Sequence, residues 1–355
     1  MLNRNLALTV LGAMLLTTGC ATYNRRALHD APLREMEQAF AHRQPALTPE
    51  LAERVLALDP ASVSARDVRE VLTHTPAPRI INIHGGIFPV HRRMISFSEF
   101  LVGMGYPRAS ITNPSDGTYT FSCYESSAKI AGMIAWYYEK EGLRPLMVGH
   151  SQGGMQVVKI LHHLAGLSGR RLEVWSPLTW RPEGRTNIVD PLTGRTQSVV
   201  GLRVPYATAT GSGGLTRLLP NQWSLCGRLR SIPGSVGEFT GFYKPFDFLG
   251  GDWFGFGEAN HSHALGTATV RNVRLPARYN HGRIPDTKHL LQSEAIREWI
   301  DQFRPADPPS SGHPEFEGDT ENLLWAAEVW YSIKKHWVLE LQRYLRARRG
   351  FPHAS

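Results

Sequence analysis

From residue 79 onward, short runs of apolar, β-branched residues alternate with longer segments whose apolar residues recur every three or four positions. The short runs predict buried strands, and the longer segments predict helices. The predicted strands cover residues 79–84, 109–112, 144–149, 197–204, 238–243 and 268–275, and the predicted helices cover 98–105, 126–142, 155–164 and 290–303. Strands that alternate with helices favour right-handed βαβ units, so we expect an α/β domain with a mostly parallel sheet over residues 79–304.

The first 19 residues have the pattern of a secretory signal. A charged start precedes an apolar stretch, Leu6–Leu16, that is shorter than the roughly 20 residues needed to span a bilayer. The stretch ends in Thr17-Thr18-Gly19-Cys20, which resembles the lipobox of bacterial lipoproteins. The resemblance implies a signal peptide over residues 1–19, acylation of Cys20 and, because alanine follows the cysteine, an outer-membrane location. Simple cleavage and a retained anchor are the alternatives.

Residues 20–78 are expected to form a polar tether followed by three short helices, at residues 32–40, 48–53 and 64–72. Thr48 and Ser64 are good N-cap residues for the second and third of these helices. We interpret the segment as a spacer that packs on the main domain.

The strongest chemical motif is Gly149-His150-Ser151-Gln152-Gly153, which lies directly between a predicted strand and a predicted helix. In this context a G-x-S-x-G sequence places the serine on a sharp turn that lifts its hydroxyl above the sheet. Gly149 and Gly153 are needed because a Cβ at either position would collide with the neighbouring strand and helix. Ser151 is therefore the candidate nucleophile.

The motif and the glycine after it read Gly-His-Ser-Gln-Gly-Gly, and here the chain resembles the α/β-hydrolase fold, in particular its bacterial lipases and esterases. The resemblance covers about residues 79–303. It implies an oxyanion hole made by the backbone N–H groups of Gln152 and of Gly86, with Ile87 as the alternative to Gly86. An ordinary tight turn is the structural alternative for the glycines after the first predicted strand.

A serine hydroxyl needs a base and an orienting acid, which in this family follow the serine in the order Asp or Glu, then His. Asp247 follows an apolar strand and a turn, so it is the candidate acid, with Asp252 in reserve. The resemblance places the histidine in a loop just before the closing helix, which favours His289 as the base. His281 is the first alternative base, and His261 and His263 follow it without preference between them.

The sequence gives no indication of a metal or cofactor site. His162 and His163 point to different faces of a helix, and neither this pair nor His261 with His263 is accompanied by acids or cysteines at ligand spacing. The glycine-rich segment 211–214 lacks the lysine of a phosphate-binding loop. We therefore expect no metal, no cofactor and no nucleotide.

Composition narrows the protein class and the partners. Of 355 residues, 42% are hydrophobic and 20% are charged, which excludes a disordered chain and a multi-span membrane protein. The net charge of +8 is concentrated in residues 334–349, which hold six basic residues and one acidic residue, so a nucleic-acid-binding body is disfavoured. Cys123 and Cys226 are equally compatible with a disulfide and with two free thiols.

Several segments outside the motif have candidate roles. Residues 166–197 are a candidate cap or lid, with a surface excursion as the alternative, and the aromatic residues of 239–256 are more typical of core than of an acyl pocket. Residues 305–318 are expected to be a linker, and residues 319–355 an amphipathic helix. Docking of this helix on its own domain is preferred over contact with an anionic membrane surface or with a partner helix.

Together these features predict an envelope-anchored serine hydrolase that cleaves carboxylic esters, including lipid esters, through an acyl-enzyme on Ser151. Acyl transfer to an alcohol or amine by the same fold is one alternative, and a non-catalytic envelope-binding lipoprotein is another. The expected partners are the ester substrate and the membrane that holds the lipid anchor.

Overall fold

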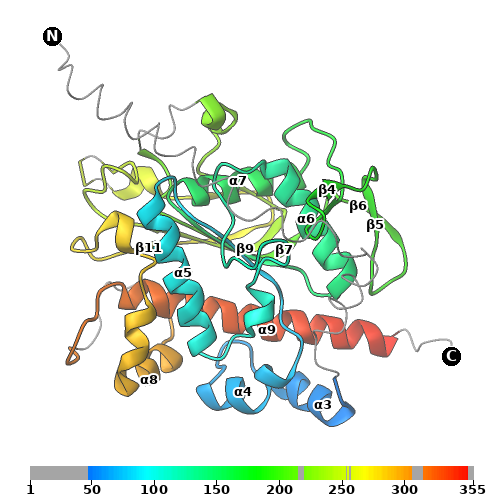
Figure 1. The fold of residues 1–355 in the computed structure, drawn as a ribbon, viewed down its shortest axis with the longest axis horizontal. Helices are drawn as coiled ribbons and strands as arrows, with labels where there is room; N and C mark the ends of the chain where they lie inside the picture. Colours follow the sequence, from blue (N-terminus) through cyan, green and yellow to red (C-terminus); the bar gives the residue numbers. More distant parts are fainter. Residues whose placement is uncertain (1–46, 215–219, 253, 256, 306–314, 351–355) are drawn as a thin grey trace.

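The computed structural model describes residues 47–214, 220–252, 254–255, 257–305 and 315–350 (Figure 1). The predicted signal peptide, Cys20 and the helix expected at 32–40 lie outside these ranges, as does most of the predicted linker at 305–318. No helix in the described part of the chain combines the length and the apolar character needed to cross a membrane.

Five strands form the central sheet, and every neighbouring pair is parallel, as the sequence predicts. The strands, in their spatial order, are β1 (Ile80–Ile83), β2 (Leu146–His150), β7 (Val204–Thr210), β9 (Val236–Tyr243) and β11 (Thr269–Arg274). β1, β2 and β7 are buried along their whole length, as is typical of strands covered on both faces. Because all five strands run the same way, the loops that follow them meet at one edge of the sheet.

Helices cover both faces of the sheet (Figure 1). The helices are α6 (Ser127–Glu141) and α7 (Gln152–Leu164) on one face, and α5 (Phe88–Gly103) and α9 (Leu323–Gly350) on the other. Successive β1 side chains point to opposite faces, so Ile80 belongs to the core beside α5 and α9, and Ile81 to the core beside α6 and α7. The domain is therefore a three-layer α/β structure.

The segment before the sheet packs on the main domain, as expected. Its helices are α3 (Pro49–Ala57) and α4 (Ala65–Glu70). Thr48 and Ser64 cap them through their side-chain oxygens. Gln342 of α9 donates to the carbonyl oxygen of Val55 at 3.2 Å and ties α3 to the C-terminal helix.

The C-terminal helix α9 docks on its own domain, which was the preferred interpretation. Its inner face carries three fully buried tryptophans, Trp325, Trp330 and Trp337. Part of its positive charge is paired within the domain, since Lys335 Nζ lies 2.5 Å from Glu238 Oε2 and Arg343 lies 2.8 Å from Glu340. Some of the basic residues of 334–349 therefore form ion pairs within the domain.

Two predicted strands differ from the observed structure. Residues 109–112 form no strand, because the chain there makes the 3-10 turn η3 (Arg108–Ser110). The strand expected at 197–204 is divided between β6 (Thr196–Ser198) and β7, which begins at Val204, because the chain turns at Gly201, whose φ of 99° favours glycine.

Two predicted helices have other bounds. The helix expected at 98–105 is the end of α5, which begins at Phe88 with Pro89 in its first turn. The helix expected at 290–303 is divided into η8 (Lys288–Gln292) and α8 (Glu294–Gln302). The division comes at Ser293, which caps α8 by accepting a hydrogen bond from Ile296 N.

Residues 166–197, the candidate lid, include small antiparallel strand pairs that pack on α6. β3 (Trp175–Ser176) pairs with β4 (Arg181–Pro182), and β5 (Asn187–Val189) pairs with β6 (Thr196–Ser198). Trp136 Nε1 in α6 donates to Glu183 at 2.8 Å, and Arg185 lies 2.5 Å from Glu139. These contacts fit an anchored surface excursion better than a mobile lid.

The remaining elements are short. They are the parallel pair β8 (Ser231–Pro233) and β10 (His263–Leu265) and the 3-10 turns η2 (Leu72–His74), η5 (Pro220–Leu225), η6 (Gly257–Asn260) and η7 (His281–Arg283). The turn η7 follows β11 and brings a histidine to the edge of the sheet where Ser151 lies.

Candidate active site

Ser151 lies on a strained turn between β2 and α7. Its backbone has φ 55° and ψ −121°, a conformation that costs a non-glycine residue about 1–3 kcal/mol. The turn also explains the flanking glycines. A Cβ at Gly149 would lie 2.5 Å from the carbonyl oxygen of Gly153, and a Cβ at Gly153 would lie 2.0 Å from that of Ile83. The predicted sharp turn is confirmed, together with its steric cause.

His281 and Asp247 complete a chain of hydrogen bonds that starts at Ser151. His281 Nε2 lies 3.0 Å from Ser151 Oγ, and His281 Nδ1 lies 2.8 Å from Asp247 Oδ2. A neutral imidazole that donates through Nδ1 to the carboxylate leaves Nε2 free to accept the serine proton. This is the arrangement that general-base activation of a serine hydroxyl requires.

Asp247 is held as a buried carboxylate. Burial alone would raise the pKa of Asp247, but the hydrogen bond and charge of His281, the Gly250 N–H and the charge of Lys244 together lower it below its usual value. The Gly250 N–H donates to Asp247 Oδ1 at 2.9 Å. The predicted acid therefore lies in the hydrogen-bonded chain. Its reserve, Asp252, instead accepts a hydrogen bond from Gly257 N at 3.2 Å and stabilises the same loop.

The structure corrects the choice of base from His289 to His281, which was the first alternative. The loop after β11 reaches the serine edge at His281 and then turns away. By His289 the chain packs on α5, where Ser96 Oγ accepts from Lys288 N at 3.0 Å. His289 Nε2 lies 3.7 Å from Asp319 Oδ1, and His289 has no place in the chain of hydrogen bonds.

The other alternative histidines also have different surroundings. His261 packs against the ring of Tyr243, and His263 Nε2 lies 3.0 Å from Ser231 Oγ. Among the described residues, no group of three or more histidines, cysteines, aspartates or glutamates could hold a metal ion. Cys123 is buried, Cys226 is exposed and both are free thiols, which answers the question that the sequence left open.

His150, which the sequence analysis did not identify, holds the backbone of His281 in place. Its Nε2 donates to the backbone carbonyl of His281 at 2.8 Å, and the two rings lie 5.1 Å apart. Burial, and then the nearby His281, lower the pKa of His150 to about 3, so it is a neutral donor. Gly211 lies next to the His281 ring. Its φ is 57°, and a Cβ at this position would lie only 2.9 Å from His281 Cε1, so glycine is needed here. His150 occupies a variable position of the motif, so local sequence gave no signal for this role.

The glycine loop after β1 lies beside Ser151, as the sequence predicts. A Cβ at Gly85 would lie 3.1 Å from Ser151 Cβ, and a Cβ at Gly86 would lie 1.9 Å from Gln152 Oε1. Gln152 begins α7, where backbone N–H groups have no partner within the helix. The Tyr124 hydroxyl donates to Gly86 O at 2.8 Å, which fixes the peptide between Gly86 and Ile87. Gln152 and Gly86 are thus adjacent, and the alternative donor, Ile87, is the residue directly before α5.

Large apolar side chains are exposed around the acid loop. Phe239 and Phe242 are core residues, as expected for this aromatic segment, but Phe246, next to Asp247, is 70% exposed. The backbone of Phe246 has the unusual φ of 53°. Its ring lies against Gly255, where a Cβ would come within 2.7 Å of the ring. Phe254 is also mainly exposed. The loop therefore presents aromatic surface beside the hydrogen-bonded chain.

We expect the protein to lose stability as the pH falls from about 6.5 to about 4. Burial, the largest cause, lowers the pKa of both His84 and His163 to about 4 and that of His150 to about 3. The unfolded chain takes up protons near pH 6.5, before the folded protein does, so acid favours unfolding. The contribution of these neutral histidines to the free energy of unfolding is complete above pH 6.5 and decreases as the pH falls below that value. Urea midpoints measured from pH 7.5 to pH 4.5 test this, and a constant midpoint would contradict it.

Comparison of the chain with protein-family models, with curated proteins and with solved structures gives no match.

Proposed function

We propose that the protein is a serine hydrolase of the α/β-hydrolase fold that cleaves carboxylic esters. The observation that carries the proposal is the chain of hydrogen bonds from Ser151 through His281 to Asp247, with the serine held on a strained turn. A protein that only binds a ligand has no need of that strain. The parallel sheet, with the serine at the end of a central strand and the histidine after the last strand, supports the same assignment.

The geometry supports hydrolysis through an acyl-enzyme. Ser151 Oγ attacks the ester carbonyl carbon while His281 Nε2 takes its proton, and ionised Asp247 stabilises the imidazolium. The proton then passes to the leaving alcohol as the carbon–oxygen bond breaks. A water molecule then gives a proton to His281 Nε2 and attacks the acyl carbon, and His281 returns this proton to Ser151 Oγ as the bond from Oγ to the acyl carbon breaks and the acid leaves.

The N–H groups of Gln152 and Gly86 are the proposed oxyanion hole. Gln152 follows Ser151 at the start of α7, and Gly86 lies in the loop after β1, where a Cβ would be 1.9 Å from Gln152 Oε1. Two fixed donors aimed at the developing alkoxide contribute several kcal/mol to lowering the barrier in such sites. The exposed aromatic residues of the acid loop suit an ester with an apolar acyl chain. The proposed place of action is the bacterial envelope, with the protein held by lipid on Cys20.

Reaction of the full-length protein in detergent with a fluorophosphonate probe and with p-nitrophenyl esters of graded chain length tests the proposal. We expect covalent labelling and hydrolysis, and we expect Ser151→Ala to abolish both because it removes the nucleophile. Ser62→Ala, at an exposed position between α3 and α4, is the matched control and should retain both. A folded protein that neither reacts with the probe nor hydrolyses any of the esters would refute the proposal.

A further inference from the structure

The 121–125 segment, which lies between the turn η3 and the helix α6, contacts both halves of the proposed oxyanion hole. Cys123 Sγ donates to Gln152 Oε1 at 3.4 Å, and the Tyr124 hydroxyl donates to Gly86 O at 2.8 Å. Two neighbouring side chains of one segment therefore reach the two residues whose N–H groups are the proposed oxyanion donors. The proposed mechanism assigns no role to either side chain.

Hydrogen bonds fix the 121–125 segment to the sheet and to α7. Phe121 N donates to Asn82 O at 2.7 Å, so residue 121 pairs with the edge of β1. At the other end of the segment, Gln156 Nε2 in α7 donates to Glu125 O. Cys123 and Tyr124 lie between these two anchors, so their backbone is held beside the loop that follows β1.

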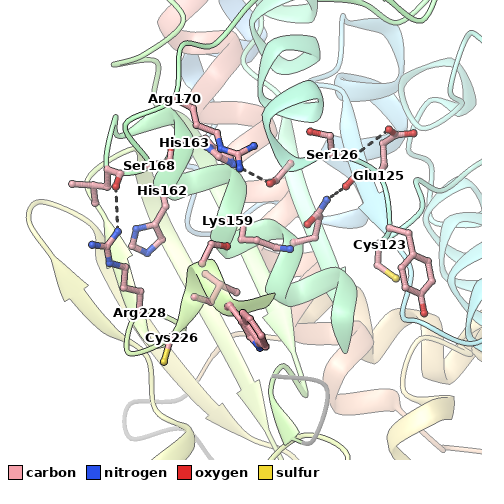
Figure 2. Close-up of a pocket in the computed structure, with 17 residues that line it drawn as sticks. Cys123, Glu125, Ser126, Lys159, His162, His163, Ser168, Arg170, Cys226 and Arg228 are labelled. Atoms are coloured by element: carbon pink, nitrogen blue, oxygen red, sulfur yellow. Dashed lines mark hydrogen bonds between the residues drawn. The ribbon is translucent and has the colours of Figure 1, made fainter. Parts of the chain in front are cut away.

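One side of the 121–125 segment borders a cleft. Cys123 and Glu125 lie on one wall of this cleft, which has a volume of about 640 Å³ and runs along α7 (Figure 2). Ser151 is not part of its lining, so the cleft is separate from the proposed ester site. Tyr124 belongs to the same wall and is 46% exposed. The position of the Tyr124 ring therefore depends less on close packing than on the bond that its hydroxyl makes.

Gly86 needs support from side chains because glycine has the greatest backbone freedom of all residues. His84 holds the peptide before it, since His84 Nδ1 donates to Gly85 O at 2.7 Å, and burial lowers the pKa of His84 to about 4. Tyr124 holds the peptide after it, and within the described part of the chain no other group donates to Gly86 O. A trans peptide directs its N–H opposite to its C=O, so the two fixed carbonyls also fix the N–H directions of Gly86 and Ile87.

Cys123 holds the other half of the oxyanion hole through the Gln152 side chain. Burial raises the pKa of the Cys123 thiol to about 12, so the thiol keeps its proton and donates. The Gln152 side chain lies over Gly86, where a Cβ would be 1.9 Å from Gln152 Oε1. Among the hydrogen bonds of the described residues, none has the N–H of Gln152 or Gly86 as its donor. Both donors are thus available while the residues that carry them are held, which is the preorganisation that an oxyanion hole requires.

We propose that Tyr124 is a positioning residue of the oxyanion hole, because its hydroxyl holds the glycine loop in the conformation that directs the second donor at the developing alkoxide. This inference rests on the proposed hydrolase function. Tyr124 exchanges no proton with the substrate and acts only through the peptide that follows Gly86. Loss of the hydroxyl should therefore weaken stabilisation of the transition state and change binding of the ground-state ester little.

Tyr124→Phe tests the inference, because it removes the hydroxyl and keeps the ring. With the full-length protein in detergent and a p-nitrophenyl ester, we expect kcat to fall by about 10-fold to 100-fold and KM to change by less than about twofold. Loss of a whole oxyanion donor costs about 10²–10³-fold, so a donor that is only misdirected should cost less. The rate constant for labelling by a fluorophosphonate should fall with kcat, since the phosphoryl oxygen of the probe uses the same donors.

Tyr119→Phe is the matched control. Tyr119 lies just before the 121–125 segment, and its hydroxyl makes no hydrogen bond within the described residues. This variant should keep the kcat, KM and labelling rate of the unchanged protein. Urea unfolding midpoints of both variants should match that of the unchanged protein, because Tyr124 is far from fully buried.

The possible outcomes separate the inference from the proposed function. Unchanged kcat and labelling in Tyr124→Phe would overturn the inference and leave the hydrolase function standing. A higher KM at unchanged kcat would also overturn it, since Tyr124 would then bind the substrate directly. A fall in kcat together with a lower urea midpoint would show a merely structural role. If the unchanged protein neither reacts with the probe nor hydrolyses any ester, the inference and the hydrolase function are both refuted.

Discussion

Replacement of His281 by alanine is expected to lower kcat/KM for a p-nitrophenyl ester by about 10⁴-fold or more. His281 Nε2 is 3.0 Å from the Ser151 hydroxyl, and without this base the hydroxyl stays protonated and is a poor nucleophile. The substitution leaves the proposed oxyanion hole in place, so a small residual rate should persist. Steady-state kinetics with purified full-length protein measures the effect.

His289→Ala is the matched control, because it removes the histidine that local sequence favoured. It should leave kcat/KM within about twofold, since a substitution outside the site and the core has little effect. Circular dichroism spectra of both variants establish that they are folded. A large loss in His289→Ala with a small loss in His281→Ala would contradict the assignment of the base.

Replacement of Trp325 by alanine is expected to lower the free energy of unfolding by about 3–5 kcal/mol. Trp325 is fully buried between α9 and the sheet and packs on Phe97 with 4.7 Å between ring centroids. Its Nε1 also donates to Thr210 Oγ1 at 2.8 Å, and the carbonyl of Thr210 accepts from Ser151 N at 2.7 Å. The substitution therefore leaves a cavity and weakens the support of the serine turn. Urea unfolding measures the loss.

Leu339→Ala is the control on the same helix. Leu339 is 38% exposed, so we expect a cost of about 1 kcal/mol or less. Equal costs for the two substitutions would mean that α9 contributes little through its buried face. That result would contradict the docking of this helix as part of the core.

The parallel sheet and the serine turn were predictable because each depends on contiguous residues. β1 and β2 are continuous apolar runs that end near glycines, and such runs are typical of strands buried on both faces. The steric need for Gly149 and Gly153 follows from the sharp turn alone. Asp247 could also be predicted from its neighbours in the sequence, because it follows the strand β9 after a short turn.

The base was not predictable in this way, because its loop is fixed by residues far along the chain. Asn322 Nδ2 donates to the carbonyl oxygens of Arg283 at 2.8 Å and Asp286 at 3.1 Å. Leu324 N donates to the Tyr279 hydroxyl at 3.0 Å. These contacts hold the loop that carries His281, and no pattern within the loop reveals them.

The same contacts make the assembly of the site depend on residues 322–325, which come later in the sequence. A ribosome makes residues 322–325 after the serine, the acid and the histidine, and only then can Asn322, Leu324 and Trp325 secure the loop and the strand end beside them. A chain that stops before Asn322 lacks these hydrogen bonds and the buried face of α9. Formation of the hydrogen-bonded chain of Ser151, His281 and Asp247 is therefore expected to follow the synthesis and folding of α9.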